Sequence, residues 1–187
     1  MDTGQPKIVG LAEVTPMSWA GEERARFLLR GTDTGGLYSF YEVIVPPGEG
    51  SVFHIHEDMD EAFYIVEGEF EITLGDDVHK VPAGVLAYGP RGVGHSFVNT
   101  WHKPSTMLCT TTPGGIEKFF EELSQLMKAR PRPEWERMRD LARQHHIISF
   151  RPPDGPNGGS PDAALRHLNQ EGIKAMTVNP AASSSGG

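Results

Sequence analysis

Short segments of strand-like sequence, separated by glycine and proline turns, fill the middle of the chain and constrain its fold most strongly. They recur from residue 27 to residue 112. In "EFEITL", Phe70, Ile72 and Leu74 alternate with polar neighbours, as in a strand with one buried face. Breaks such as Pro46-Pro47-Gly48 end the segments. Many short strands joined in this way predict an all-β sandwich or barrel.

The period changes to that of a helix after residue 112. "IEKFFEELSQLMKAR" and "PRPEWERMRDLARQHHI" each place apolar residues along one helical face. We therefore expect an N-terminal arm, a β-barrel, a C-terminal helical segment, and finally a linker with a short helix and a flexible tail. The expected boundaries are 1–26, 27–112, 113–150 and 151–187.

The charge and composition exclude several classes of partner. The 187 residues carry a formal charge of −8, which argues against nucleic acid or an anionic membrane surface as a partner. No apolar run approaches the roughly 18 residues that span a bilayer, and the N-terminus lacks a signal-peptide pattern. Cys109 is the single cysteine, so no intrachain disulfide can form. We expect a cytoplasmic protein.

Three histidines and one glutamate are candidate ligands of a metal ion. His54 and His56 are two residues apart in a predicted strand, so both imidazoles face one side. Glu61 lies in the next strand and His95 opens a later one. Together they offer three nitrogens and one oxygen to a divalent transition metal: Fe, Ni, Mn, Co or Zn. Such a set leaves one or two coordination positions open, as a catalytic site requires.

The spacing around these residues forms two motifs. The first is G-x5-H-x-H-x4-E-x6-G, from Gly48 to Gly68, and the second is G-x5-P-x-G-x2-H-x3-N, from Gly84 to Asn99. With both motifs complete and in order, the chain resembles the cupin superfamily. The resemblance implies a double-stranded β-helix, or jelly-roll barrel, with C-terminal α-helices and a metal held by the four candidate ligands. Cupins commonly dimerise, and the apolar stripes of the helices need cover, so we expect a homodimer.

Strand alternation also predicts an apolar pocket near the candidate ligands. This favours an aromatic or polyketide-like small molecule over a sugar phosphate, because no arginine cluster lies in the motif region to bind phosphate. Ordinary barrel packing is the alternative explanation for each of these side chains. The expected pocket residues are Phe53, Phe63, Ile65, Phe70, Ile72 and Phe97.

Beyond the barrel, "TTPGGIEKFFEEL" and "MRDLARQHHIISF" are similar to segments of the bacterial single-cupin quercetin 2,3-dioxygenases. This resemblance implies cleavage of a flavonol heterocycle by O2 with release of carbon monoxide, with Glu61 acting as the base. A metal-dependent cupin isomerase or cyclase in secondary metabolism remains an alternative. So does a non-catalytic small-molecule-binding cupin, although no DNA-binding helix-turn-helix precedes the barrel. The resemblance does not cover residues 151–187.

Overall fold

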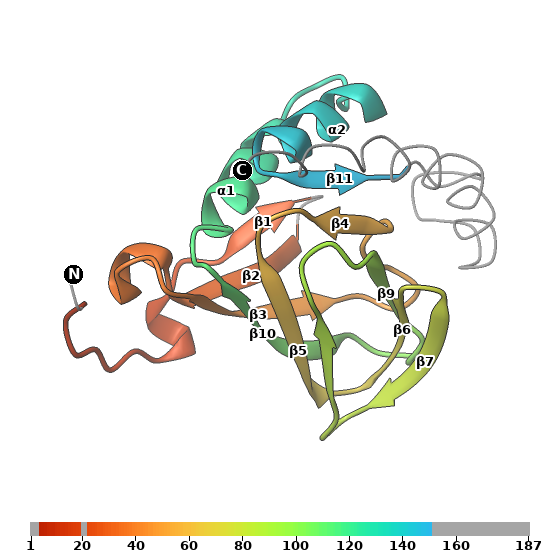
Figure 1. The fold of residues 1–187 in the computed structure, drawn as a ribbon, viewed down its shortest axis with the longest axis horizontal. Helices are drawn as coiled ribbons and strands as arrows, with labels where there is room; N and C mark the ends of the chain where they lie inside the picture. Colours follow the sequence, from red (N-terminus) through yellow and green to blue (C-terminus); the bar gives the residue numbers. More distant parts are fainter. Residues whose placement is uncertain (1–3, 20–21, 151–187) are drawn as a thin grey trace, which may run out of the picture.

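Two antiparallel sheets form the body of the molecule (Figure 1). The computed structural model describes residues 4–19 and 22–150, so the linker, short helix and tail predicted for 151–187 lie outside the described residues. The six-stranded sheet has the order β1-β2-β3-β10-β5-β8, with bounds Met17–Trp19, Glu22–Leu29, Ser39–Val45, Ser105–Thr112, Asp60–Glu67 and Leu86–Gly89. The five-stranded sheet has the order β11-β4-β9-β6-β7, with bounds Ile147–Ser149, His54–His56, His95–Asn99, Glu69–Leu74 and Asp77–Pro82.

This architecture confirms the prediction of an all-β jelly roll followed by helices. Strands β1 and β2 join the sheet ahead of residue 27, so part of the predicted N-terminal arm is paired with the barrel. A 3-10 helix, Leu11–Glu13, precedes β1, and a second, Gly31–Thr34, connects β2 to β3.

The hydrophobic core lies between the two sheets and follows the alternation of the strands. Along β10, every second residue from Ser105 to Thr111 is buried. In β6, Phe70 and Ile72 are almost completely shielded from solvent. Successive side chains of a strand point to opposite faces, so each strand supplies every second side chain to this core. The barrel therefore holds the elements that carry the candidate ligands in a fixed register.

The turn from β5 to β6 requires glycine at position 68. Gly68 has φ of +90°, a conformation that other residues rarely adopt. A Cβ atom there would also lie 1.9 Å from Ser105 Oγ. Gly68, the last residue of the first motif, is thus required by the backbone conformation of this turn. The position of this turn sets where β6 begins.

Two helices, α1 (Glu117–Met127) and α2 (Trp135–Gln144), lie across one side of the barrel (Figure 1). Strand β11 then returns the chain to the barrel, where Ile147 is paired with His56 and Ser149 with His54. Phe119 and Phe120 of α1 pack against the core. The helices predicted from the sequence are confirmed, but their apolar faces are covered within the chain and do not by themselves require a second copy.

A buried carboxylate fixes the start of α1 to the barrel. Glu117 is only 3% exposed, and it accepts hydrogen bonds from the Gly31 N–H at 2.9 Å and from the Ser39 hydroxyl at 2.7 Å. Its negative charge lies in the first helical turn, where the helix dipole favours an acid. This contact holds the helical segment in place over the barrel. Neither helix of the described part has the length and apolar content needed to cross a membrane.

Candidate metal centre and its cavity

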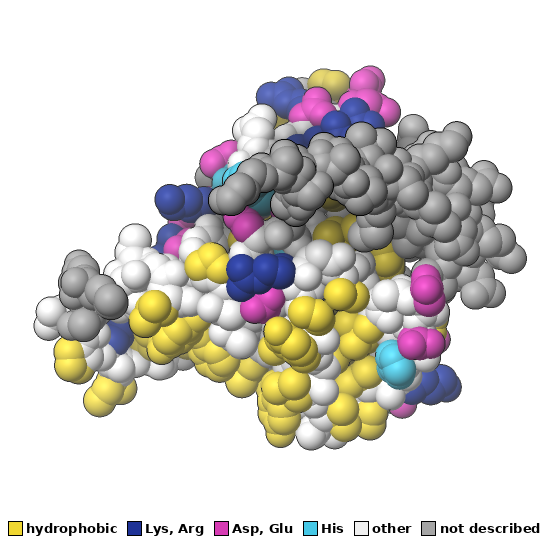
Figure 2. All heavy atoms as spheres, in the orientation of Figure 1, with side chains coloured by type: hydrophobic (Ala, Val, Ile, Leu, Met, Phe, Trp, Pro, Cys, Tyr) yellow, Lys and Arg dark blue, Asp and Glu magenta, His cyan; other side chains and the backbone are white. Residues whose placement is uncertain are grey.

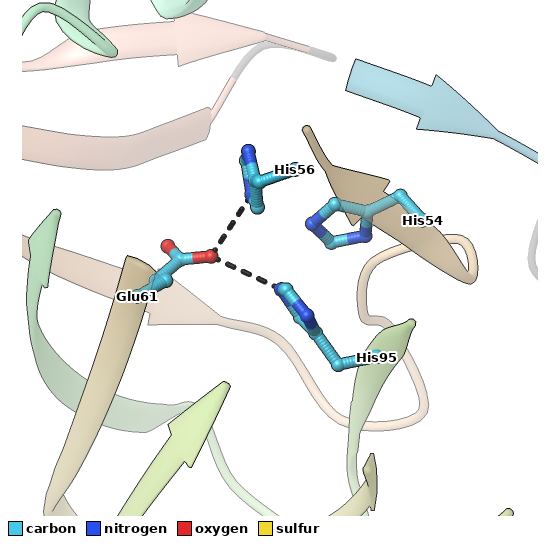
Figure 3. Close-up of side chains that lie close together, drawn as sticks. All are labelled: His54, His56, Glu61 and His95. Atoms are coloured by element: carbon cyan, nitrogen blue, oxygen red, sulfur yellow. Dashed lines mark hydrogen bonds and ion pairs between the residues drawn. The ribbon is translucent and has the colours of Figure 1, made fainter. Parts of the chain in front are cut away.

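The four residues expected to be metal ligands lie together at one end of the barrel interior (Figure 3). His54 and His56 come from β4, Glu61 from β5 and His95 from β9. His54 and His95 are directly opposite each other where β4 pairs with β9. Each residue offers one potential ligand atom, an imidazole nitrogen or a carboxylate oxygen, and these four atoms all lie within 4.8 Å of one another. His54 and His95 are 41 positions apart in the sequence. The four residues meet because three strands, from both sheets, lie next to one another there.

Glu61 lies at the middle of the cluster as an ionised carboxylate. Its Oε2 is 3.2 Å from His56 Nε2 and 3.2 Å from His95 Nε2. Burial raises the pKa of the Glu61 carboxyl, but the hydrogen bonds and charges of the two histidines outweigh burial and hold that pKa well below its usual range. Glu61 is consequently negative at neutral pH and can balance the charge of a cation.

Tyr41, on β3, holds the other oxygen of this carboxylate. Its hydroxyl donates a hydrogen bond of 2.5 Å to Glu61 Oε1. Burial first, and then the negative charge of Glu61, raise the pKa of the Tyr41 hydroxyl well above its usual value. The hydroxyl therefore keeps its proton and remains a donor. This role of Tyr41 was not predicted from the sequence, because Tyr41 lies outside both cupin motifs.

Backbone carbonyls orient two of the three imidazoles. Nδ1 of His54 is 2.8 Å from the Val52 carbonyl, and Nδ1 of His95 is 3.1 Å from the Val93 carbonyl. A carbonyl can only accept, so each Nδ1 carries a proton and each Nε2 is the nitrogen left to face the cluster, the one that a metal ion would take. Burial, together with the neighbouring His95 and His56, holds the pKa of His54 well below its usual value, so this ring is neutral.

The donor set fits a divalent transition metal. Both nitrogens of His95 face acceptors, the Val93 carbonyl and the Glu61 carboxylate. Both contacts are satisfied only by a doubly protonated ring or by a cation in place of the Nε2 proton. His56 Nδ1 is also buried without a hydrogen-bond partner in the described part of the chain. Three imidazoles and one carboxylate suit Fe, Ni, Mn, Co or Zn, and they do not choose between them.

A cavity of about 950 Å³ opens over the cluster, with the barrel on one side and the helical segment on the other. Of the pocket residues expected from the sequence, Phe63 and Phe97 line it. The remaining four are outside its lining and are buried side chains: Phe53, Ile65, Phe70 and Ile72. Alternation identified the inward face of each strand, but it did not separate the wall of the cavity from the core beneath it.

The helical segment supplies wall residues that were not predicted. Their signal was the amphipathic pattern of the helices, which indicated a covered face without showing what it covers. The apolar members include Phe119, Phe120, Leu123, Met127, Trp135 and Met138, and Arg132 and Arg139 also line the cavity. The walls are thus largely aromatic and aliphatic, and two guanidinium groups lie on the helical side.

Asp60, the first residue of β5 and the neighbour of Glu61, has a separate structural role. Asp60 accepts hydrogen bonds from Arg91 Nε at 2.9 Å, Arg91 Nη2 at 3.0 Å and the Arg91 backbone N–H at 2.9 Å. These bonds lower the pKa of Asp60 to about 2. Arg91 lies in the turn before β9, so this pair ties the strand of Glu61 to the turn that leads to His95.

A protein-family comparison identifies the barrel. The model "Cupin_2: Cupin domain" matches residues 41–111, and this part of the chain is a cupin domain, as the two motifs predicted. A solved structure described as an RmlC-like cupin from Shewanella frigidimarina NCIMB 400 is 16% identical, with a TM-score of 0.53, covering 62% of this chain and 98% of that one. At this identity the likeness concerns the fold.

Curated relatives of the chain are named for different activities. Quercetin 2,3-dioxygenase of Bacillus subtilis (strain 168) is 26% identical over 102 residues, which is 54% of this chain and 29% of the relative. Polyketide synthase CurC of Streptomyces cyaneus is 28% identical over 114 residues, 60% of this chain and 73% of the relative. An uncharacterized protein of Methanocaldococcus jannaschii is 33% identical over 75 residues, 40% of this chain and 60% of the relative. The chain thus spans less than two thirds of two of these relatives.

Proposed function

We propose that the chain is a metal-dependent cupin dioxygenase that acts on a flavonol-like or other aromatic or polyketide substrate. The observation that carries this proposal is a buried cluster of three histidines and an ionised glutamate that opens into a cavity with aromatic walls. The kinship with quercetin 2,3-dioxygenase supports the choice of reaction.

His54, His56, Glu61 and His95 would hold the metal. When bound, a divalent transition metal supplies the positive charge that acidifies a substrate hydroxyl and the redox capacity that reaction with O2 requires. Glu61 accepts the hydroxyl proton at one carboxylate oxygen, while Tyr41 holds the other oxygen in place. The aromatic walls bind the rings of the substrate and exclude water.

Elemental analysis followed by oxygen-electrode measurements with quercetin tests this function. We expect about one transition metal per chain, consumption of O2, and loss of the flavonol absorption band. Glu61→Gln should keep some metal and lose turnover, whereas Glu57→Gln, in the neighbouring exposed loop, should behave like the wild type. A metal-loaded protein that consumes no O2 with quercetin or any related aromatic substrate would refute the dioxygenase.

A cupin cyclase or isomerase is the second candidate, and the similarity to polyketide synthase CurC over 60% of this chain favours it. In that case the same cavity would bind an aromatic polyketide, and the metal would act as a Lewis acid. The two functions differ in their need for O2: a cyclase converts its substrate equally well under argon. A third function, small-molecule binding without catalysis, would be supported if chelation left ligand binding intact.

We also propose that the chain forms a homodimer through the outer face of β5 and β8. Tyr64, Val66, Leu86 and Tyr88 are exposed there, and Tyr64 is the cross-strand partner of Leu86. Figure 2 shows hydrophobic side chains gathered on the lower part of the face in view. Because β8 is an edge strand of its sheet, a second copy could cover this apolar surface. Light scattering should give a dimer for the wild type and a monomer for Leu86→Glu.

A further inference from the structure

Two arginines of the helical segment, Arg132 and Arg139, line the otherwise largely apolar cavity. Arg132 lies between the two helices, and Arg139 lies in α2 on the same face as Trp135, Met138 and Ala142, which also line the cavity. These positions are three, four and seven residues from Trp135, as expected for one helical face. The orientation of α2 therefore directs a basic residue to the cavity along with the apolar ones.

Arg139 forms a loose ion pair with the exposed Asp140, and one of its donors is buried without a partner among the described residues. Its Nε is shielded from solvent and has no hydrogen-bond partner in the described part of the chain. Its Nη2 comes within 3.7 Å of Asp140 Oδ1, which is longer than a hydrogen bond. The side chain as a whole is 36% exposed, but proteins rarely leave a buried N–H such as this Nε–H unpaired, because it has lost its water without gaining a partner. Arg139 is thus ready for an acceptor that enters the cavity.

No acid of the cavity can serve as that acceptor. Glu61 is the one acidic residue among those that line it within the described ranges. Both oxygens of Glu61 are already engaged, by Tyr41 on one side and by His56 and His95 on the other. A bound divalent cation would add further positive charge beside Glu61. The cavity as a whole therefore favours an anionic ligand.

We propose that the substrate carries a carboxylate, which Arg139 binds on the helical wall with Arg132 nearby, while the reacting part of the molecule faces the metal centre. A guanidinium presents donors in a planar fork that matches the two oxygens of a carboxylate. The aromatic walls between the two ends suit a ring system. This inference rests on the proposed use of the cavity as a substrate site, and it narrows the substrate class from aromatic compounds in general to aromatic acids.

A matched pair of probes tests the carboxylate without any need for turnover. 6-Hydroxy-2-naphthoic acid and its methyl ester have the same ring and hydroxyl, and they differ in charge at the opposite end. Binding to the metal-loaded full chain is measured by calorimetry and by quenching of tryptophan fluorescence, to which Trp135 of the cavity wall contributes. We expect the acid to bind about tenfold or more tightly than the ester, since a hydrogen bond to a charged group is worth that much.

Variants then assign the preference to its residue. Arg139→Met should reduce the preference for the acid to about twofold or less while leaving the affinity for the ester unchanged. Arg143→Met removes the same charge from an exposed position of the same helix outside the cavity, and it should keep the preference. Arg132→Met should lower the preference in part, and it serves as the second variant if Arg139→Met does not fold by circular dichroism.

Equal binding of acid and ester by the wild type would overturn the proposal, and so would a preference that survives in both cavity variants. Failure of the dioxygenase proposal has a different signature. If the acid is preferred through Arg139 but no probe or related acid supports O2 consumption, the carboxylate site stands and the reaction class is wrong. Oxygen consumption without any preference for acids leaves the dioxygenase in place and overturns the carboxylate site alone.

Discussion

The hydrogen bond between Tyr41 and Glu61 can be removed with almost no change in packing. Tyr41→Phe deletes a single oxygen, and the ring that remains still stacks on Phe27 at a centroid distance of 4.6 Å. The lost bond is completely buried and its acceptor is ionised. A hydrogen bond to a charged group contributes about 1.5–3 kcal/mol. We therefore expect the free energy of unfolding to fall by about that amount in chelator-treated protein, measured by urea unfolding.

The same variant should separate turnover from substrate binding. Without the Tyr41 hydroxyl, one oxygen of Glu61 loses its partner and the carboxylate can rotate away from the substrate proton. We expect kcat to fall about tenfold or more, as for loss of a positioned group, with KM nearly unchanged because the cavity walls are intact. Tyr38→Phe, which removes the hydroxyl of an exposed tyrosine, is the control and should change neither quantity. Unchanged stability and kcat in Tyr41→Phe would refute the positioning role.

Other perturbations probe the frame of the site. Asn99 donates two and accepts two hydrogen bonds with its side chain, so Asn99→Ala should destabilise the barrel by about 3–5 kcal/mol in urea unfolding, whereas the exposed Thr100→Ala should cost less than about 0.5 kcal/mol. Glu117→Gln cannot accept at both of its contacts, and it should speed amide hydrogen exchange in α1 while leaving the exchange of the core strands unchanged. His95→Ala should abolish the rise in melting temperature that metal addition produces in the wild type; an equal rise would show that the ion binds elsewhere.

The extent to which the site could be predicted depends on whether its residues share a local pattern. His54 and His56 on one strand face are a direct consequence of strand alternation, and the second motif includes Gly92, whose φ of +79° shapes the turn before His95. Tyr41 meets Glu61 only because β3 and β5 both pair with β10. Such an arrangement follows from strand order, which no short stretch of sequence contains.

The helical wall of the cavity could not be predicted from the sequence for a similar reason. The periodicity of residues 116–144 predicted two amphipathic helices correctly, but the partner of their apolar faces depends on β11. This strand has three residues, Ile147–Ser149, and its pairing with β4 closes the helices over the barrel. A strand so short has no periodicity that distinguishes it from a loop. The contribution of Arg139 to the cavity therefore became visible only with the fold.

Separate parts of the chain supply the metal centre and much of the cavity wall, and this division bears on what the relatives can indicate. The cupin family match ends at residue 111, whereas the helical wall begins at Ile116. Similarity within residues 41–111 therefore concerns the candidate metal ligands and the barrel side of the cavity, and not its helical wall. Because β11 pairs directly with the strand of His54 and His56, this surface is nevertheless held rigidly against the metal centre. Exchange of α1 and α2 between such proteins should consequently change the preferred substrate while the metal content stays the same.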